Sequence, residues 1–236
     1  MLRLFGWYSE PSAANTTQPI STPNSAHHPS SLTNGKKTET ELEKSVERLK
    51  NNDPSLTYLS LSYESIGVAG TIAIAKALKV NTVLTELFLR GNSIGDHGAE
   101  AIADALQVDR NLTTLHLSDD SIGVNGAKAI AKALMSNTVL TKLSLNYNSI
   151  GDDGAKDIAK VLNMNNFLTE LGLKYNSIGF DGANNIVEAL MNNTVLTKLD
   201  LNGNRIGDDG AKAIANALKN NKVLTTLDLK CTSIGD

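Results

Sequence analysis

Three kinds of side chain in this sequence could support chemistry: a histidine beside carboxylates, paired carboxylates and a single thiol. His116 is followed closely by Asp119 and Asp120, a combination that could move a proton. No partnered nucleophile accompanies these residues, and no pattern predicts a pocket around them, as an acid–base site requires. We therefore interpret His116 as a surface residue and Asp120 as a substitution in a structural series. The sequence predicts no catalytic residues and no enzymatic activity.

The other chemical groups do not predict a metal or cofactor site. Calcium takes six to eight oxygen ligands, and the doubled carboxylates Asp152–Asp153 and Asp208–Asp209 lack the spacing of a calcium-binding loop. The adjacent His27–His28 makes at best a weak transition-metal site. Cys231 is the only cysteine, which excludes an intrachain disulfide or a multi-cysteine metal site. We expect neither metal nor cofactor.

Composition narrows the classes of partner. The 236-residue chain has a formal net charge of −3, which predicts neither nucleic acid nor an anionic membrane as a partner. The apolar stretch at the N-terminus is too short for a signal-peptide core, and no run reaches the roughly 18 apolar residues of a membrane span. A single cysteine is compatible with a reducing compartment. The expected location is cytoplasmic.

An internal repeat dominates the sequence. The phrase Leu-Thr-x-Leu-x-Leu starts at Leu56 and returns every 28 residues without insertion or deletion. In each unit, alternating apolar residues such as Leu143 and Leu145 predict a short strand. Small and aliphatic residues then follow at helical spacing, as in Ala155, Ile158, Ala159 and Leu162. Asp152 is placed to cap that helix, and we expect Asn165, just beyond it, in the left-handed conformation.

This pattern resembles the leucine-rich-repeat signature, whose landmarks are matched by Leu84, Leu87, Leu89, Asn92 and Ile94. The 28-residue length and helical second half are similar to the ribonuclease-inhibitor-like subclass. The resemblance implies an α/β solenoid, a horseshoe arc with a parallel sheet on its concave face and helices on its convex face. It also implies a ladder of asparagines that bond turn backbone, formed by Asn92, Asn148, Asn176 and Asn204 and interrupted by Glu64, Asp120 and Thr232.

Two glycines recur in every unit of the repeat. The first, from Gly67 to Gly207, is expected to provide a tight or left-handed turn. The second, from Gly98 to Gly210, is expected to allow close approach at the first turn of the helix. Because both recur in every unit, we interpret them as structural and not as a phosphate-binding loop.

The chain divides into three parts. Residues 1–37 form a Ser/Thr/Pro/Asn-rich tail that we expect to be disordered. Residues 38–55 predict a helix that covers the N-terminal end of the stack, with Thr40 and Glu43 as a capping box. Residues 56–236 form six full repeats and a truncated seventh. Leu227, Leu229 and Ile234 then lie at an open end, which leaves either a fragment of a longer protein or self-association through this edge.

The family geometry places the residues between the strand leucines on the concave face. Five positive and five negative residues there leave no strip of a single sign, which argues against a nucleic-acid groove. Tyrosine and arginine are enriched at energetic hot spots of protein interfaces. The partner-binding residues that we predict are Phe88, Arg90, His116, Tyr147, Lys174 and Tyr175.

The function expected from these features is a non-enzymatic scaffold that binds a protein on its concave face. Two alternatives remain open. One is a GTPase-activating regulator resembling the Ran GTPase activators, whose partner would be a small GTPase, although no functional residue of that family can be placed on this chain. The other is the ligand-sensing repeat region of a protein resembling the NOD-like receptors.

Overall fold

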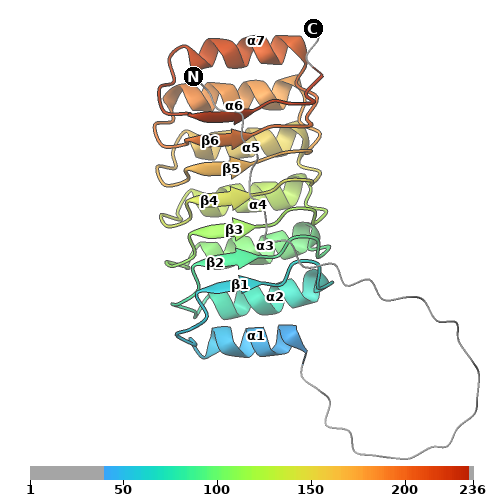
Figure 1. Cartoon of the computed structure of the whole chain (residues 1–236), viewed down its shortest axis with the longest axis vertical. Coiled ribbons are helices and arrows are strands. Elements are labelled where there is room, and N and C mark those ends of the chain that lie inside the picture. Colours follow the sequence, from blue (N-terminus) through green and yellow to red (C-terminus); the bar gives the residue numbers. More distant parts are fainter. Residues whose placement is uncertain (1–39, 234–236) are drawn as a thin grey trace, which may run out of the picture.

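The computed structural model describes residues 40–233, in which helices and short strands alternate along the chain (Figure 1). The strands form one parallel seven-stranded sheet in sequence order. The strands are β1 (Tyr58–Ser60), β2 (Glu86–Phe88), β3 (Thr114–His116), β4 (Lys142–Ser144), β5 (Glu170–Gly172), β6 (Lys198–Asp200) and β7 (Thr226–Asp228). The helices are α1 (Glu41–Lys50), α2 (Gly67–Leu78), α3 (Gly95–Leu106), α4 (Val124–Leu134), α5 (Gly151–Leu162), α6 (Phe180–Asn192) and α7 (Gly207–Leu218). This arrangement is the predicted α/β leucine-rich-repeat arc.

The constant 28-residue spacing keeps every strand in the same register. Leu87 of β2 pairs with Leu59 of β1 on one side and with Leu115 of β3 on the other. The central leucine of each strand is buried, and its neighbours in sequence point to the opposite face. The repeated threonine adds a further link, because the Thr113 hydroxyl donates to the Thr85 carbonyl at 3.1 Å, and the same bond recurs between later repeats. Identical repeats thus produce continuous hydrogen-bonded rows.

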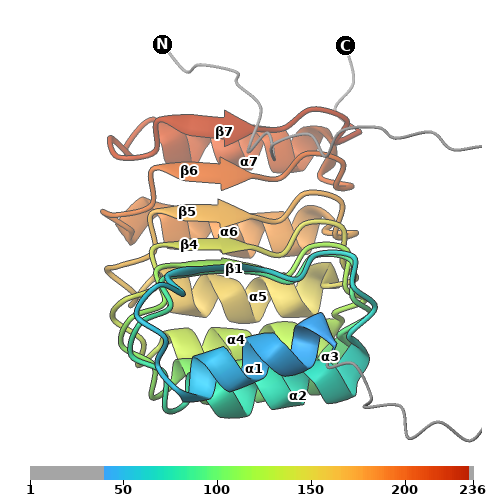
Figure 2. The same cartoon turned by 60° about the horizontal axis from the view of Figure 1, so that its bottom comes forward.

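The helices α2 to α7 lie together on one side of the sheet and leave the other side open (Figure 2). Their inner faces carry alanine, isoleucine and leucine, which pack in one continuous core with the strand leucines. The second glycine of each unit permits this packing: a Cβ at Gly98 would lie 2.4 Å from Ile94 Cγ2 and 3.3 Å from Thr71 Cγ2. The predicted close approach at the first helical turn is confirmed.

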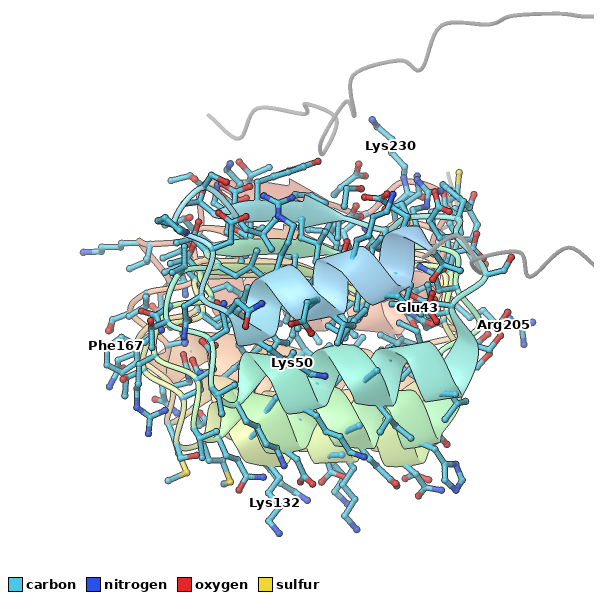
Figure 3. All side chains as sticks on the ribbon, turned by 90° about the horizontal axis from the view of Figure 1, so that it is seen from below. Glu43, Lys50, Lys132, Phe167, Arg205 and Lys230 are labelled. Carbon is cyan, nitrogen blue, oxygen red and sulfur yellow. The ribbon has the colours of Figure 1, made fainter. Side chains whose placement is uncertain are left out.

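Helix α1 covers the N-terminal end of the stack (Figure 3). Thr40 and Glu43 form the predicted capping box: the Glu43 N–H donates to the Thr40 hydroxyl, and the Thr40 N–H donates to the Glu43 carboxylate. Val46 and Leu49 are buried against the next layer. The side-chain amide of Asn81 also donates to the Leu49 carbonyl at 2.8 Å, which ties α1 to the first repeat.

Two ladders of asparagine run through the stack. In the first, Asn148 donates to the Leu117 and Leu145 carbonyls and accepts from the Ile122 N–H; Asn92, Asn176 and Asn204 are buried in equivalent positions. The second lies at the other end of the strands and was missed from the sequence. Each member accepts hydrogen bonds from backbone N–H groups of the loop before its strand and donates to a carbonyl at the end of the helix in the previous repeat. The members are Asn81, Asn137, Asn165, Asn193 and Asn221.

The predicted left-handed conformation of Asn165 is therefore wrong. Asn165 has a negative φ, and its side chain donates to the Leu134 carbonyl at 2.8 Å while accepting from the Leu168 N–H. The helix ends in a tight turn instead, in which the Asn165 N–H bonds the Val161 carbonyl. The residue supplies a side chain to the ladder, and its backbone needs no special conformation.

The prediction that Asp152 caps its own helix is also wrong, because its carboxylate bonds the helix of the next repeat. The helix that contains Asp152 begins at Gly151 without a side-chain cap. The Asp152 carboxylate instead accepts hydrogen bonds from the N–H groups of Gly179 (2.7 Å) and Gly182 (3.0 Å), at the start of α6 in the next repeat. Asp96 bonds Gly123 and Gly126 in the same way. Being the second residue of its own helix, each aspartate points sideways along the stack.

These carboxylates determine the conformation of the first glycine of the unit. Gly95 and Gly151 have positive φ angles of 60° and 61°, and their N–H groups bond carbonyls of the following repeat. Gly123 and Gly179 are extended, because their N–H groups bond an aspartate of the preceding repeat. The expected left-handed turn is therefore present in only part of the series.

Some expectations lie outside the described residues. These are the disordered tail at 1–37, with its His27–His28 pair, and the apolar end residue Ile234. Within residues 40–233, no helix combines the length and apolar character that crossing a membrane requires.

Candidate functional site

The open face of the sheet carries parallel rows of side chains, because equivalent residues of successive repeats lie side by side. Four such rows cross the face, numbered here in the direction in which each strand runs. The first is Tyr58, Glu86, Thr114, Lys142, Glu170, Lys198 and Thr226, and the second is Ser60, Phe88, His116, Ser144, Gly172, Asp200 and Asp228. The third is Ser62, Arg90, Ser118, Asn146, Lys174, Asn202 and Lys230, and the fourth is Tyr63, Gly91, Asp119, Tyr147, Tyr175, Gly203 and Cys231.

The first row carries charges that neutralise one another. The Glu170 carboxylate lies 3.0 Å from the Lys198 ammonium and 3.7 Å from the Lys142 ammonium. The Glu170 side chain is largely buried between these two lysines, each of which keeps part of its length exposed. This group of one carboxylate between two ammonium groups gives the middle of the first row only a small net charge.

The second row begins with an aromatic cluster. Phe88 and His116 stack with ring centroids 4.4 Å apart, and Tyr58 packs on the other side of Phe88 at 5.1 Å. Burial lowers the pKa of His116 to about 4, and the positive charges of Lys142 and Arg90 add to this effect. His116 is therefore a neutral, half-buried ring at pH 7, and the face that it shares with Phe88 is apolar.

The second row ends in carboxylates. Burial raises the pKa of Asp200, whose carboxylate accepts a hydrogen bond from the Asn202 N–H at 2.9 Å, and the charge of Asp228 raises it further. Asp228 lies 3.8 Å from the Lys230 ammonium. Negative charge thus gathers at the C-terminal end of this row.

The third and fourth rows interleave cations with tyrosines. The Arg90 guanidinium carbon lies 5.4 Å from the Tyr63 ring centroid and 5.9 Å from that of Tyr147. The Lys174 ammonium lies 5.3 Å from the Tyr147 ring and 5.5 Å from the Tyr175 ring, and the two rings stack at 5.0 Å. We call Tyr63, Arg90, Tyr147, Lys174 and Tyr175 the aromatic–cationic strip. These distances are typical of cation–π contacts.

The three tyrosines of the strip share a strained backbone. Their φ angles are +63° at Tyr63, +56° at Tyr147 and +50° at Tyr175. A left-handed conformation costs a residue with a Cβ about 1–2 kcal/mol. Glycine stands at the same position in two other repeats, and there each glycine lies under the tyrosine of the preceding repeat: a Cβ at Gly91 would be 2.4 Å from the Tyr63 ring, and one at Gly203 would be 2.5 Å from Tyr175.

The five positive and five negative residues expected on this face are present, but the two signs are not mixed evenly. Within the described residues, the charges of the first row neutralise one another around Glu170, and the second row ends in Asp200 and Asp228. The charged residues of the third row are all cations: Arg90, Lys174 and Lys230. Counting residues could not detect this, because the sign of charge depends on the position within each repeat.

His116, Asp119 and Asp120 do not form an acid–base group. His116 stacks on Phe88, Asp119 is exposed in the fourth row, and Asp120 is fully buried in the first asparagine ladder. Asp120 Oδ1 accepts from the Asn92 N–H at 2.7 Å, while Oδ2 is buried without a hydrogen-bond partner. Burial raises the pKa of Asp120 to about 7.

Asp109 repeats this situation in the second ladder. Its Oδ1 accepts from the Leu112 N–H at 2.7 Å, its Oδ2 is buried without a partner, and burial raises its pKa. Both aspartates flank β3, so this strand has a carboxylate at each end where most other repeats have an asparagine amide. Across residues 40–233, no group of three or more histidine, cysteine or acidic residues is placed to hold a metal ion.

Two features of this face were missed from the sequence. Tyr58 completes the aromatic cluster, and the alternation of exposed strand positions could have identified it. The Lys142–Glu170–Lys198 group was also missed, although a cross-strand comparison at 28-residue spacing would have found the alternating signs.

The comparisons with known proteins identify the type of domain. The model of the TMOD/LMOD leucine-rich domain matches residues 38–181, and a leucine-rich-repeat model matches residues 192–215. A solved structure of leiomodin-1 actin-binding site 2 is 32% identical to this chain, with a TM-score of 0.55. The matched region covers 57% of this chain and 79% of the leiomodin-1 structure. The tropomodulin C-terminal domain of Caenorhabditis elegans is 12% identical, covers 77% of this chain and 93% of its own, and has a TM-score of 0.50, a likeness of fold.

The comparison with curated proteins gave no match. The matched family replaces the two others considered from the sequence, the Ran GTPase activators and the NOD-like receptors. It is a family of non-enzymatic domains, as the sequence predicted. The chain belongs to the tropomodulin/leiomodin leucine-rich-domain family.

Proposed function

We propose that this chain is a non-enzymatic actin-binding domain that contacts actin with the open face of its sheet. The observation that carries the proposal is the family match, together with 32% identity to a leiomodin-1 structure described as an actin-binding site. This chain covers 79% of that structure's length. Actin therefore replaces a small GTPase as the proposed partner.

The residue types on the open face support this role. The six residues predicted from the sequence to bind a partner fall into two groups: Phe88 and His116 stack with Tyr58, while Arg90, Tyr147, Lys174 and Tyr175 belong to the aromatic–cationic strip. Aromatic residues and arginine supply much of the binding energy of protein interfaces. Both groups are held on a rigid parallel sheet, so little side-chain freedom is lost on binding.

Two finer features accompany the proposal. Each 28-residue unit pairs a short strand with an α-helix, which is our reason for proposing ribonuclease-inhibitor-like repeat geometry within the family. An actin-binding role also places the protein in the cytoplasm, with the cytoskeleton.

Co-sedimentation of the full chain with actin filaments, paired with gel filtration against monomeric actin, tests the proposal. The variant Phe88→Ser/His116→Ser removes the apolar part of the face. Serine stands at the same row position in β1 and β4, at Ser60 and Ser144, so the fold accepts it. The control is Lys132→Gln on the helical side, opposite Lys230 in Figure 3.

We expect the wild-type chain and Lys132→Gln to bind actin with equal affinity. The double serine variant should bind at least about tenfold more weakly, as loss of a buried hot-spot contact predicts. Failure of the wild-type chain to bind either form of actin would contradict the proposed partner. If the double serine variant still binds actin as tightly as the wild type, actin does not contact this part of the face.

A further inference from the structure

Two cations of the open face are brought to a single ring. The Arg90 guanidinium carbon and the Lys174 ammonium lie 5.9 Å and 5.3 Å from the centroid of Tyr147. Their charges are thus no more than about 11 Å apart, although three repeats separate the two residues in sequence. Each cation also lies near a second ring: Arg90 is 5.4 Å from the centroid of Tyr63, and Lys174 is 5.5 Å from that of Tyr175.

Neither cation lies within 4 Å of a carboxylate in the described part of the chain. This distinguishes them from Lys142, Lys198 and Lys230, each of which does. A side-chain hydrogen bond with Tyr147 and the charge of Asp200 raise the pKa of Lys174, so Lys174 stays charged. The Nε of Arg90 is buried without a hydrogen-bond partner, so its charge is already partly removed from water. The one carboxylate of the fourth row, that of Asp119, is exposed and makes no ion pair with Arg90.

A partly dehydrated guanidinium loses less hydration on binding than a fully hydrated one. It therefore gains more from an incoming carboxylate than an ordinary surface arginine does.

The left-handed backbone is a property of the repeat and not of the tyrosines. Tyr63, Tyr147 and Tyr175 share it with the other residues of the fourth row, which are Gly91, Asp119, Gly203 and Cys231. Exposure of their rings is what distinguishes the three tyrosines. The rings remain exposed by 40–56%, so they are available to a partner.

We propose that the aromatic–cationic strip is the docking site for an acidic segment of the partner protein, with Arg90 and Lys174 each receiving a carboxylate. The idea rests on the proposed function and specifies the chemistry of the partner at this face. In an extended chain, two acidic side chains two residues apart lie on the same face, about 6.6 Å from each other, so both can reach cations that are no more than about 11 Å apart. The exposed faces of the tyrosine rings provide flat surfaces against which the intervening peptide packs.

Protein carboxylates fit this strip better than a phosphate group. A single phosphate concentrates its charge at one point, whereas the strip presents two cations on either side of a ring. The planar guanidinium of Arg90 can bind either anion through two parallel hydrogen bonds, so the separation of the two cations is what favours a pair of carboxylates. The third row contains no acidic residue among the described positions, so an acidic segment that runs along it meets only cations and neutral side chains.

The test uses the full chain labelled with ¹⁵N and a synthetic peptide, acetyl-Gly-Glu-Gly-Glu-Gly-amide, whose two glutamates share one face of an extended chain. A peptide with glutamine in place of both glutamates is the matched probe, and inorganic phosphate is the third arm. Dissociation constants come from the amide shifts during titration. The variants are Arg90→Gln, with Lys132→Gln on the helical side as its control (Figure 3), and Tyr147→Gly, which uses the residue that the fold accepts at Gly91 and Gly203.

We expect the glutamate peptide to shift the amides around Tyr147 and Lys174, and the glutamine peptide to bind at least about tenfold more weakly. Arg90→Gln and Tyr147→Gly should each weaken binding of the glutamate peptide by a similar factor, and Lys132→Gln should bind it like the wild type. Equal binding of the two peptides, or wild-type binding by Arg90→Gln, overturns the proposal. Tighter binding of phosphate than of the glutamate peptide at these amides also overturns it.

Actin co-sedimentation with the same proteins separates this idea from the proposed function. A chain that binds the glutamate peptide on the strip but not actin contradicts the partner and leaves the strip in place. A chain that binds actin but not the peptide contradicts the strip alone.

Discussion

The carboxylate of Asp152, in the first turn of α5, accepts a hydrogen bond of 2.7 Å from the backbone N–H of Gly179, where α6 begins. One repeat therefore caps the helix of the next. Side-chain caps stabilise a helix by about 1 kcal/mol, and a carboxylate gains further from the helix dipole.

We predict that Asp152→Ala lowers the free energy of unfolding by about 1–2 kcal/mol, measured by urea denaturation. The control is Asp153→Ala, which removes the adjacent and exposed carboxylate. Its loss should change the stability by less than about 0.5 kcal/mol. Equal losses in the two variants would show that the cap across the repeat boundary contributes nothing specific.

A second prediction concerns the buried carboxylate of Asp120. Its pKa is raised from 3.8 to about 7 in the folded chain, so the folded state binds a proton that the unfolded state releases between about pH 4 and pH 7. The free energy of unfolding must therefore fall as the pH rises through this window. Asp120→Asn removes this loss and restores an amide that can donate to the ladder carbonyls.

We expect Asp120→Asn to stabilise the domain by about 1–3 kcal/mol above pH 7, the cost of a buried polar group without a partner. The gain should shrink towards pH 4, where the aspartate is protonated. Chemical denaturation at several pH values measures it, with the exposed carboxylate of Asp153 as control in Asp153→Asn. Asp119 is unsuitable as a control, because its charge contributes to the raised pKa of Asp120. A gain that does not depend on pH would contradict the raised pKa.

A third prediction uses two left-handed glycines with similar backbones. Gly67 and Gly91 have φ angles of +59° and +71°, but a Cβ at Gly67 meets nothing within 4 Å, whereas one at Gly91 enters the Tyr63 ring. Both alanine variants should lose about 1–2 kcal/mol through backbone strain. Gly91→Ala should lose more, because the ring must leave Arg90 to make room.

The double variant Gly91→Ala/Tyr63→Gly isolates this extra loss. If the ring is its cause, the extra loss disappears when the ring is removed, and a double-mutant cycle measures the coupling between the two sites. Additive losses would mean that Tyr63 moves aside without cost.

The aromatic cluster gives a fourth prediction. Because burial is the largest cause of the lowered pKa of His116, exposing its ring in Phe88→Ser should raise that pKa from about 4 towards the ordinary 6.5. Titration of the imidazole resonances by NMR measures the change. Phe167→Ser removes an exposed aromatic ring from the loop before β5 and should leave the pKa of His116 unchanged.

The sequence was sufficient for the periodic part of the fold. Leu84 and its equivalents recur at an exact interval, so strand register, the helix faces and the first asparagine ladder could be predicted from one unit. The capping box at Thr40 and Glu43 was equally accessible, because its bonds join residues close in sequence.

Contacts between repeats were harder to predict. Asp152 acts on the next repeat, and sequence reasoning naturally assigned its carboxylate to the helix in which it lies. The Arg90–Tyr147 contact also crosses two repeat boundaries and depends on how two long side chains lean across the sheet. Periodicity gives the position of each residue in the stack but not the direction of its side chain.

The two aspartate caps have a consequence for how this chain comes apart. Asp96 joins α3 to α4, and Asp152 joins α5 to α6; these are also the helix pairs that pack most extensively. Although the sequence repeats every 28 residues, the unit that unfolds cooperatively is then expected to contain two repeats. We expect hydrogen exchange to reveal modules of two repeats that open as units, with the seams between α2 and α3, α4 and α5, and α6 and α7 separating first.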